Sequence, residues 1–451
     1  MSIKKKNKLT ALLFLGLGLV LWMAASQKEA KVEKKDRSFP GRGGFRSVNQ
    51  GLPLQYNGPK YAPGQVLVKF RPTVSAQSVQ TTIGAYESRI VRRIPQINVY
   101  QLQIPGSATV EEMVYVLGQN PDVVYAEPNY TTAITVSPND EFFWRQYALY
   151  NSGDILAIPG SPQGKSRADI KATAAWEETK GDGDIVIAVI DTGVDLRHPD
   201  LKNKIANSGR DFVNDDFEAT DDHGHGTHVA GIAAAETNNS QGIAGVAWNC
   251  KVLPVKVVDK GGSGLYSWLI EGINWAADNG AQVINMSLGA DAYSDALKEA
   301  VKYAYDKGLV LVAAAGNTGG SVFYPAAFDD YCLAVAATDY SDSWVPWSNV
   351  GAQVDVAAPG VFILSLVPTW YWGPSSPPYS FWSGTSMAAP HVSGLAALVK
   401  SLKPWLKPAE IMNVIRYSAD DVNSTTLSGK DDQIGYGRIN MEKALVPLKV
   451  K

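Results

Sequence analysis

The chain has 451 residues, 45% of them hydrophobic and 19% charged, which excludes collagen-like, coiled-coil and wholly disordered classes and allows two or three domains. Residues 1–136 contain 17 Lys and Arg against 8 Asp and Glu, whereas residues 137–451 contain 24 against 36. These balances of +9 and −12 predict two pieces with separate functions, and the acidic piece is a poor candidate for binding nucleic acid.

Lysines cluster within residues 4–8, and an apolar run from Leu9 to Ala25 follows them and ends in small residues. This order is typical of a secretory signal peptide, which we assign to residues 1–26. A membrane anchor is the alternative, because about 17 apolar residues reach the lower limit for spanning a bilayer. The small residues favour cleavage, so we expect export to the cell envelope or medium, with no stable membrane partner afterwards.

Residues 27–61 are polar, rich in Lys, Gly and Pro and without periodicity, which predicts a disordered linker. From residue 62, strand and helix patterns alternate in the order β-α-β-β-α-β, which predicts a ferredoxin-like α+β domain over residues 62–136. The final segment, Thr131–Ser137, is open and rich in Thr. The predicted strands are Gln65–Phe70, Ile90–Val91, Ile97–Ile104 and Val123–Ala126, and the predicted helices are Ser75–Ile83 and Ala108–Gly118.

In residues 137–451, short apolar runs alternate with amphipathic segments. Runs that are almost wholly apolar are typical of parallel strands covered by helices on both faces, so we predict an α/β fold. Catalytic groups of such folds lie at the carboxyl ends of the strands. The predicted strands are Ile185–Ile190, Val252–Val258, Val283–Met286, Val310–Ala315 and Leu333–Ala337, and the predicted helices are Thr227–Ala235, Ser267–Asn279 and Asp295–Lys307.

The two cysteines, Cys250 and Cys332, each stand at the entry to a predicted strand. In an exported chain the two cysteines could form a disulfide, but one disulfide cannot be the basis of the fold in so long a chain. We prefer two buried thiols.

Three polar positions stand at the predicted strand ends and helix starts. Asp191 directly follows an apolar strand, His225 lies where the segment 221–231 opens a helix, and Ser386 opens an Ala-rich helix that runs to about Leu402. A carboxylate, an imidazole and a hydroxyl beside a helix N-terminus are the components of a nucleophilic triad. Their order, Asp, His, Ser, is one of three orders that build the same geometry.

The spacing His223-x-His225-x-x-His228 offers zinc as an alternative, but zinc needs further ligands and a supporting shell, and His225 already has a role in the triad. We expect His198, His228 and His391 to be structural and His223 to be an exposed loop residue.

These motifs resemble those of the subtilisin family of serine proteases, thermitase-like members above all, over residues 137–445. Residues 62–136 resemble the family's inhibitory propeptide, with residues 123–129 as its closing strand. The resemblance implies a monomeric serine endopeptidase that acts on proteins and peptides and is made as a self-processing zymogen inhibited by its own propeptide. A peptide-binding relative without activity is the rival, but it would need a lost catalytic residue.

The resemblance also implies a role for each matching residue. Ser386 would be the nucleophile, His225 the base and Asp191 the group that orients it, while Asn317 in Ala313-Ala-Ala-Gly-Asn317 would donate to the oxyanion. The substrate would pair with two segments, Gly262-Ser263-Gly264 and Ser287-Leu288-Gly289. Tyr266 would line an outer pocket. Phe323, just before Tyr324-Pro325, would form the floor of the primary pocket and favour small or medium apolar residues.

Calcium is the cofactor that the resemblance implies. Asp140, Asp200 and the Asn239 side chain would bind one ion, with carbonyl groups from Glu236, Gln241 and Ile243. A second site would use Asp211 and Asp216 in the acidic segment 211–220, for which a solvated acidic loop is the alternative.

Overall fold

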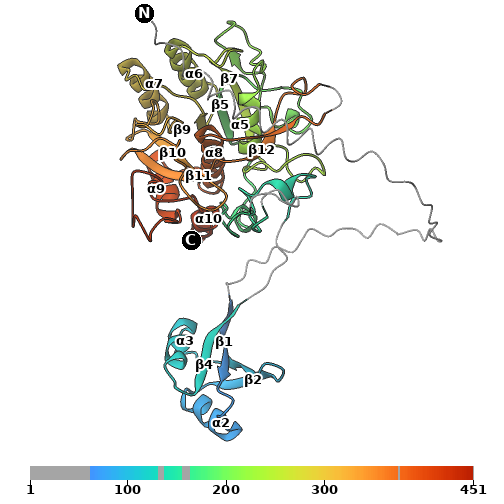
Figure 1. The fold of residues 1–451 in the computed structure, drawn as a ribbon, viewed down its shortest axis with the longest axis vertical. Coiled ribbons are helices and arrows are strands. Elements are labelled where there is room, and N and C mark those ends of the chain that lie inside the picture. The colour runs from blue at the N-terminus through green and yellow to red at the C-terminus, as the bar shows by residue number, and fades with distance from the viewer. Residues whose placement is uncertain (1–60, 131–136, 155–162, 374–375, 450–451) are drawn as a thin grey trace, which may run out of the picture. The chain divides into compact units, whose positions relative to one another are not determined.

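A computed structural model describes residues 61–130, 137–154, 163–373 and 376–449. The predicted signal peptide 1–26, residues 27–60 of the predicted linker and residues 131–136 of the open Thr-rich segment lie outside the described residues. The described residues form two folded parts, residues 61–130 and residues 137–449 (Figure 1).

The N-terminal part is a four-stranded antiparallel sheet with two helices. Its strands stand in the order β2-β3-β1-β4, which is the ferredoxin-like arrangement that the sequence predicted. Alternation places Val66, Val68 and Phe70 of one strand in the core, where they pack with the helices. The elements are β1 (Tyr61–Phe70), α2 (Ala76–Ala85), β2 (Arg89–Ile94), β3 (Val99–Gln103), α3 (Val110–Gly118) and β4 (Val123–Tyr130).

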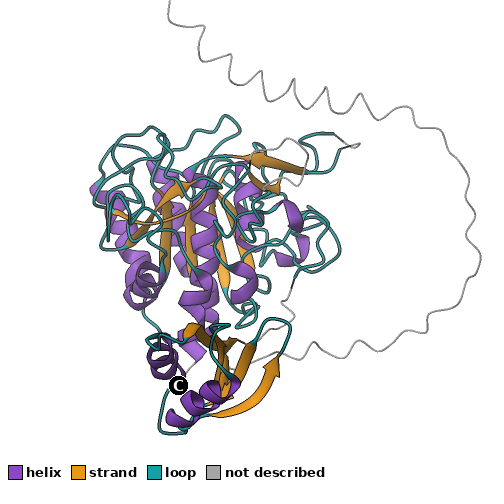
Figure 2. Cartoon of the chain, turned by 60° about the horizontal axis from the view of Figure 1, so that its bottom comes forward, coloured by secondary structure: helices purple, strands orange, loops and turns teal. Residues whose placement is uncertain are grey.

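The C-terminal part contains a seven-stranded parallel sheet in the order β11-β10-β9-β8-β5-β7-β6. This confirms the α/β fold with helices on both faces of a parallel sheet (Figure 2). The strands are β5 (Val186–Asp191), β6 (Arg210–Asp211), β7 (Lys251–Lys256), β8 (Val283–Met286), β9 (Val310–Ala314), β10 (Cys332–Thr338) and β11 (Val354–Pro359).

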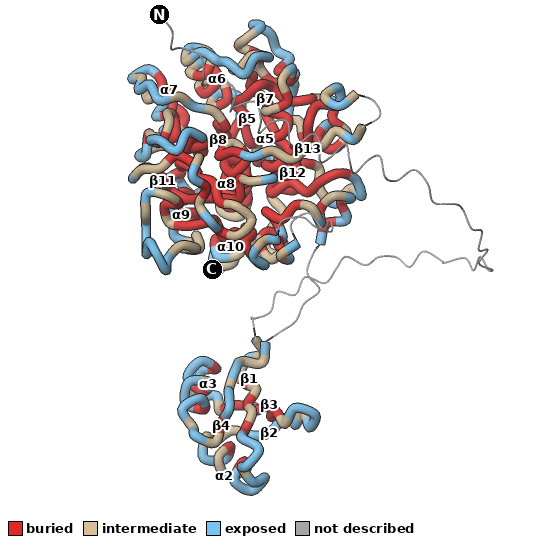
Figure 3. The backbone as a smooth tube through the Cα atoms, viewed as in Figure 1, coloured by how far each residue is buried: buried red, intermediate tan, exposed pale blue. Residues whose placement is uncertain are grey.

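The strands of this sheet other than the two-residue β6 send side chains into two separate cores. In β5, Ile187 and Val189 pack in one core, and Ala188 and Ile190 pack in the other. The strands are therefore buried on both faces, as Figure 3 shows in red. The first core contains side chains from α5 (His225–Ala234), α8 (Thr385–Leu402), α9 (Pro408–Ser418) and α10 (Met441–Lys449), and the second from α6 (Tyr266–Asp278) and α7 (Asp295–Asp306).

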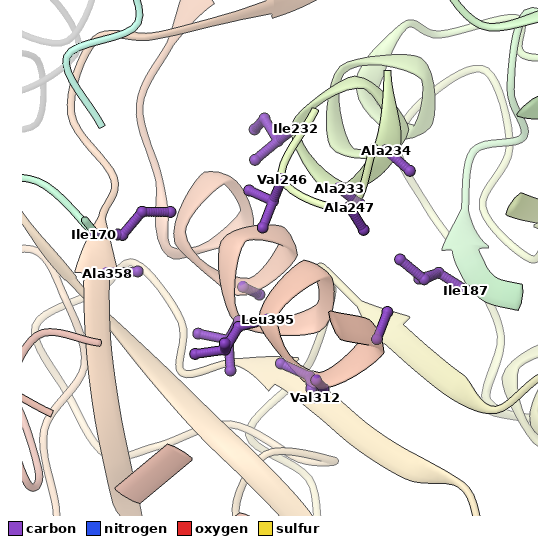
Figure 4. Packing of buried hydrophobic residues seen from close by; sticks show 14 of the residues in the cluster. Ile170, Ile187, Ile232, Ala233, Ala234, Val246, Ala247, Val312, Ala358 and Leu395 are labelled. Atoms are coloured by element: carbon purple, nitrogen blue, oxygen red, sulfur yellow. The ribbon is translucent and has the colours of Figure 1, made fainter. Parts of the chain in front are cut away.

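The helix α8 is buried over most of its length, from Thr385 to Val399 apart from Ser386. A Cβ atom on Gly394 would lie only 2.6 Å from Val246 Cβ, so glycine lets α8 approach the chain that follows α5. Figure 4 shows Leu395 of α8 beside Val312 of β9. Because close packing resists displacement, the first residues of α8 are fixed relative to the sheet.

Smaller elements complete this part. An antiparallel hairpin of β12 (Ile363–Leu366) and β13 (Tyr379–Trp382) precedes α8. Cys250 and Cys332 are free, buried thiols that belong to different cores. Within the described ranges, no helix is both long and apolar enough to cross a bilayer. The remaining short helices are η1 (Phe143–Arg145), α4 (Ala172–Ala175) and η2 (Lys202–Lys204).

Candidate active site

Asp191 is the last residue of β5, and His225 is the first residue of α5, two residues before the predicted helix start. His225 Nδ1 lies 2.8 Å from Asp191 Oδ1. Because an ionised carboxylate only accepts hydrogen bonds, Nδ1 carries the proton and Nε2 is left as an acceptor. Asp191 Oδ1 also accepts from the Thr192 amide at 2.7 Å, while Asp191 Oδ2 is buried and has no hydrogen-bond partner among the described residues.

The pKa of His225 reflects two opposing effects. Burial by itself lowers this pKa, but the charge and hydrogen bond of Asp191 and the charge of Asp221 raise it above its ordinary value. The site therefore favours the imidazolium ion that a general base forms when it takes a proton.

Asp221 holds the start of α5, a role that the sequence analysis missed. Its Oδ2 accepts from the Thr227 amide at 3.0 Å and the Thr227 hydroxyl at 2.6 Å, and its Oδ1 accepts from the Thr192 hydroxyl at 2.8 Å. This buried carboxylate thus ties the end of β5 to the helix that carries His225. The available signal was an Asp a few residues before a helix, where it can bind free N–H groups.

Ser386 is the second residue of α8, and its hydroxyl donates to the Ser287 carbonyl at 2.9 Å. The Ser287 hydroxyl in turn donates to the Ser386 carbonyl at 2.8 Å. Asn285 and Ser393, both buried, extend this network beneath Ser287. The sequence analysis missed Asn285, although a polar residue inside an apolar strand requires such partners.

Asn317 follows β9 and reaches the start of α8. Its Oδ1 accepts from the Thr385 amide at 2.8 Å and the Thr385 hydroxyl at 2.9 Å. These two donors fix the orientation of the side-chain amide, so its NH₂ group is left to donate elsewhere. The structure thus brings Asn317 beside the residue that precedes Ser386.

The two predicted substrate segments follow β7 and β8, the strands on either side of β5. Asp259 Oδ1 accepts from the Gly261 and Ser263 amides at 2.8 and 3.0 Å, which lowers the pKa of that carboxyl and closes the loop that contains Gly262, Ser263 and Gly264. Ser287 and Leu288 are part of the chain leaving β8. Tyr266 begins α6 and donates its hydroxyl to the Ala292 carbonyl at 2.7 Å.

The resemblance places the primary pocket between Ser287–Gly289 and Ala314–Gly316, and Phe323 lies close to a glycine of each segment. A Cβ atom on Gly289 would be 3.1 Å from Phe323 Cβ, and one on Gly316 would be 2.8 Å from Phe323 Cδ2. The Phe323 amide also donates to the Ala315 carbonyl at 2.9 Å. The side chain therefore packs against both walls.

Two known protein families match this chain. Residues 182–437 match the Subtilase family, and residues 54–129 match the fervidolysin N-terminal prodomain. The chain belongs to the Subtilase family. It is a serine-type endopeptidase with an N-terminal prodomain.

Several characterised subtilases are similar over most of this chain. Thermophilic serine proteinase of Bacillus sp. (strain AK1) is 42% identical over 85% of this chain and 88% of its own length. Thermitase of Thermoactinomyces vulgaris is 44% identical over 68% and 99%. The crystal structure of fervidolysin from Fervidobacterium pennivorans, described as a keratinolytic enzyme, has a TM-score of 0.56 and 31% identity over 87% of this chain and 62% of that one.

The residues expected at the first calcium site converge in this subtilase. The Asn238 amide donates to both Asp140 oxygens, at 3.0 and 2.9 Å, and the Asn239 side chain donates to Asp200 Oδ1 at 2.8 Å. Both carboxylates are buried. Burial, and then repulsion from neighbouring acids, raises the pKa of Asp200 to about 7, and burial raises that of Asp140.

A dication would relieve this charge, so these residues fit calcium. The expected ligand set contains two carboxylates and otherwise amide and carbonyl oxygens. Among the described residues, no three His, Cys, Asp or Glu side chains are placed together to hold a metal. The three residues expected to give carbonyl groups, Glu236, Gln241 and Ile243, follow one another along the loop after α5.

At the second expected calcium site, the acidic side chains are held by their own loop. Asp211 Oδ1 accepts from the amides of Val213 and Asn214 at 2.7 and 2.9 Å. Asp216 Oδ1 accepts from the Glu218 amide at 2.9 Å. Asp211 and Asp216 also pair through their backbones, so they are neighbours. These contacts are those of a self-contained acidic loop, and the metal site stays a prediction.

The other histidines divide as predicted, with one difference. His198, His228 and His391 are buried, and burial lowers the pKa of His228 to about 3 and that of His391 to about 4. His223 is half-buried rather than exposed, because its ring lies 3.4 Å from the position of a Cβ on Gly262.

Proposed function

We propose that this subtilase hydrolyses peptide bonds through an acyl-enzyme formed on Ser386, with His225 as general base and Asp191 as its orienting carboxylate. The observation that carries the proposal is the 2.8 Å contact between His225 Nδ1 and Oδ1 of the buried Asp191. Asp191 ends β5 and Ser386 is the second residue of α8, and catalytic groups of parallel α/β sheets lie at the carboxyl ends of the strands.

In the first half of the reaction, Ser386 Oγ leaves its contact with Ser287 and attacks the substrate carbonyl carbon as its proton passes to His225 Nε2. The carbonyl oxygen becomes an oxyanion that accepts from the Asn317 NH₂ group and the Ser386 amide. His225 then protonates the leaving amine, and the C–N bond breaks to leave an ester on Ser386.

In the second half, water attacks this ester while His225 takes one of its protons. The proton then returns to Ser386 Oγ as the acid product leaves. Asp191 stays ionised throughout and stabilises the imidazolium ion, in line with the raised pKa of His225.

The substrate backbone would pair with Gly262-Ser263-Gly264 and Ser287-Leu288-Gly289 as an added strand. Such pairing recognises backbone, so protein and peptide substrates of many sequences are admitted. Tyr266 would contact an outer residue of the substrate, and Phe323 would limit the residue before the scissile bond.

The prodomain would act as an intramolecular inhibitor. The balances of +9 for residues 1–136 and −12 for residues 137–451 favour association of the two parts at low salt. We expect self-cleavage within residues 131–137, and we expect the mature enzyme to be a monomer. The signal-like N-terminus and the relative described as an extracellular serine protease, from Natrialba magadii, support export.

Calcium would be held by Asp140, Asp200 and Asn239 with carbonyl groups of Glu236, Gln241 and Ile243, and by a second site at Asp211 and Asp216. When bound, the ion supplies charge neutralisation and stability rather than chemistry. The Asp200 backbone carbonyl accepts from the Glu236 amide at 2.8 Å, which links the two chain segments that share the first site.

The proposal is tested by replacing Ser386 with Ala. The control is Ser401→Ala, which removes a hydroxyl from the other end of the same helix. In a host without other proteases, Ser386→Ala should accumulate as the uncut proprotein and take no label from a sulfonyl fluoride, while Ser401→Ala should mature and become labelled. Normal maturation or labelling of Ser386→Ala would show that another residue is the nucleophile.

A further inference from the structure

The strand β13 has one end at the residues expected to bind calcium and the other end beside the proposed general base. Its first residue, Tyr379, packs edge-on against Phe142 at 5.1 Å and His198 at 5.6 Å, centroid to centroid. Its last residue, Trp382, lies 6.2 Å from the His225 ring. All four residues of β13 pair with β12, so a shift at one end of this short strand is transmitted to the other.

The hydroxyl of Tyr379 lies beside Asp200, a buried carboxylate of the first calcium site. A Cβ atom on Gly242 would be 2.1 Å from Asp200 Oδ2 and 2.3 Å from the Tyr379 hydroxyl, so the two oxygens are close neighbours. Gly242 has a φ of +56° and belongs to the loop that is expected to supply carbonyl groups to the ion. Only a residue without a side chain leaves room for this approach. Tyr379 therefore adjoins the calcium site, although the expected ligand set does not contain it.

His198 connects the same two segments through its ring. Its Nδ1 accepts from the Asp200 amide at 3.1 Å, which leaves the ring proton on Nε2, and Nε2 donates to the Pro378 carbonyl at 3.2 Å. His198 is fully buried, so water does not compete for these hydrogen bonds. Asp200 is thus tied to the residue that precedes β13, in addition to facing the first side chain of the strand.

Later residues of β13 contact the helix that carries the general base. The Ser380 carbonyl accepts from His228 Nε2 at 3.1 Å, and the Trp382 ring stacks on the His228 ring at 4.6 Å. His228 lies about one turn after His225 in α5. A shift of β13 would therefore move the His225 imidazole relative to Ser386.

On the basis of the proposed function, we propose that Tyr379 is a positioning residue that, together with His198, couples the first calcium site to His225 through β13. When bound, the ion neutralises Asp200 and so fixes a residue that both side chains adjoin. Charge relief at Asp200 thereby favours the arrangement of β13 and α5 in which His225 can take the Ser386 proton. The coupling acts on the alignment of the catalytic groups, beyond the stability that calcium binding adds.

Thermodynamic reciprocity provides a test that does not depend on turnover. If calcium favours the alignment of His225 with Ser386, a reagent that locks this alignment must raise the affinity for calcium by the same factor. A peptide chloromethyl ketone that ends in Ala is the lock. His225 Nε2 displaces chloride from its methylene carbon, which leaves the ring cationic, and the Ser386 hydroxyl adds across its carbonyl group. The comparison is the enzyme labelled with a sulfonyl fluoride, which occupies Ser386 alone and equally prevents self-digestion.

The calcium affinity of both forms of the mature enzyme is measured at low temperature by competition with a chelating dye. We expect the locked form to bind the ion at least about fivefold more tightly than the sulfonyl form. Tyr379→Phe, which keeps the ring, should lower this ratio to about half or less. The control is Tyr303→Phe, which removes a hydroxyl that donates to Asp278 at 2.9 Å from α7, a helix of the second core, and should keep the ratio. Asp200→Ala should abolish binding of this ion, which identifies the first site.

The outcomes separate the two proposals. An enzyme that takes neither label would refute the proposed function, and this inference would fall with it. Normal labelling with equal calcium affinity in the two forms of the unmutated enzyme would refute only the coupling. A ratio that Tyr379→Phe leaves unchanged would assign the coupling to other contacts and refute the role of Tyr379. Calcium binding that Asp200→Ala does not weaken would place the ion elsewhere and would also refute the inference.

Discussion

Phe323 should set the size of the residue accepted before the scissile bond. Phe323 lies against Gly289 and Gly316, the walls of the expected primary pocket, so a large substrate ring would compete with the Phe323 ring for the same space. We therefore expect the enzyme to prefer small or medium apolar residues over Phe, Tyr, Lys or Arg. Phe323→Gly should open the space and shift acceptance toward aromatic residues.

The size of this shift follows from packing. Forcing a ring into a filled site costs roughly 1–3 kcal/mol, which corresponds to about 5- to 150-fold in relative rate. A vacated site should also gain part of the ~1.5–3 kcal/mol that burial of a Phe side chain provides. We expect kcat/KM for Phe relative to Ala to rise by at least about tenfold in Phe323→Gly.

The assay uses competing peptides that differ only in the residue before the scissile bond, with products quantified from one mixture. Phe323→Ala separates the loss of the ring from the added flexibility of glycine. Phe217→Ala serves as a control, because Phe217 is a 69% exposed Phe on the acidic loop. If the unmutated enzyme turned over the Phe peptide as well as the Ala peptide, the ring of Phe323 would not limit the site and the reasoning would be wrong.

Four further predictions concern the triad, the first calcium site and the start of α5. Asp191→Asn should lower kcat about 10⁴-fold by stabilising the wrong imidazole tautomer. In the unmutated enzyme, kcat/KM should fall as pH drops through the raised pKa of His225, because the protonated ring cannot accept a proton. Chelation should lower the melting temperature, and Asp200→Ala should remove most of that sensitivity. Asp221→Ala should cost about 2 kcal/mol or more of unfolding free energy in urea, because it leaves buried donors unpaired.

Each of these has a clear contrary result. An Asp191→Asn enzyme with nearly full kcat, or an acid limb well below the ordinary pKa of histidine, would remove Asp191 from the triad. Melting curves that do not change with chelator would contradict both calcium sites. Asp221→Ala is best measured in the Ser386→Ala background, which should prevent self-digestion, and an unchanged stability there would mean that Asp221 does not anchor α5.

The sequence predicted the fold where burial was uniform. β5, β7, β8, β9 and β10 were recognisable because both faces of the sheet are covered, so nearly all residues of each run are apolar. β11 was not predicted, since it carries Asp355, which is buried only because Arg416 and the Ala334 amide hydrogen-bond to it. The strand could not be predicted because Arg416, which stabilises the buried Asp355, is distant from it in sequence.

The candidate site follows the same rule. Asp191, His225 and Ser386 stand out through their motifs, but Asp221 and Asn285 act through hydrogen bonds across 29 and 108 positions of sequence. No local pattern encodes such contacts.

The burial of α8 affects how this protease is digested by other copies of itself. A protease cuts a peptide bond only where the surrounding chain can adopt an extended form, and α8 cannot do so without unfolding the first core. Nicks should therefore collect in exposed loops while Ser386 keeps its position. We infer that activity should outlast the intact chain on a gel, and that it should vanish only when the whole C-terminal part unfolds.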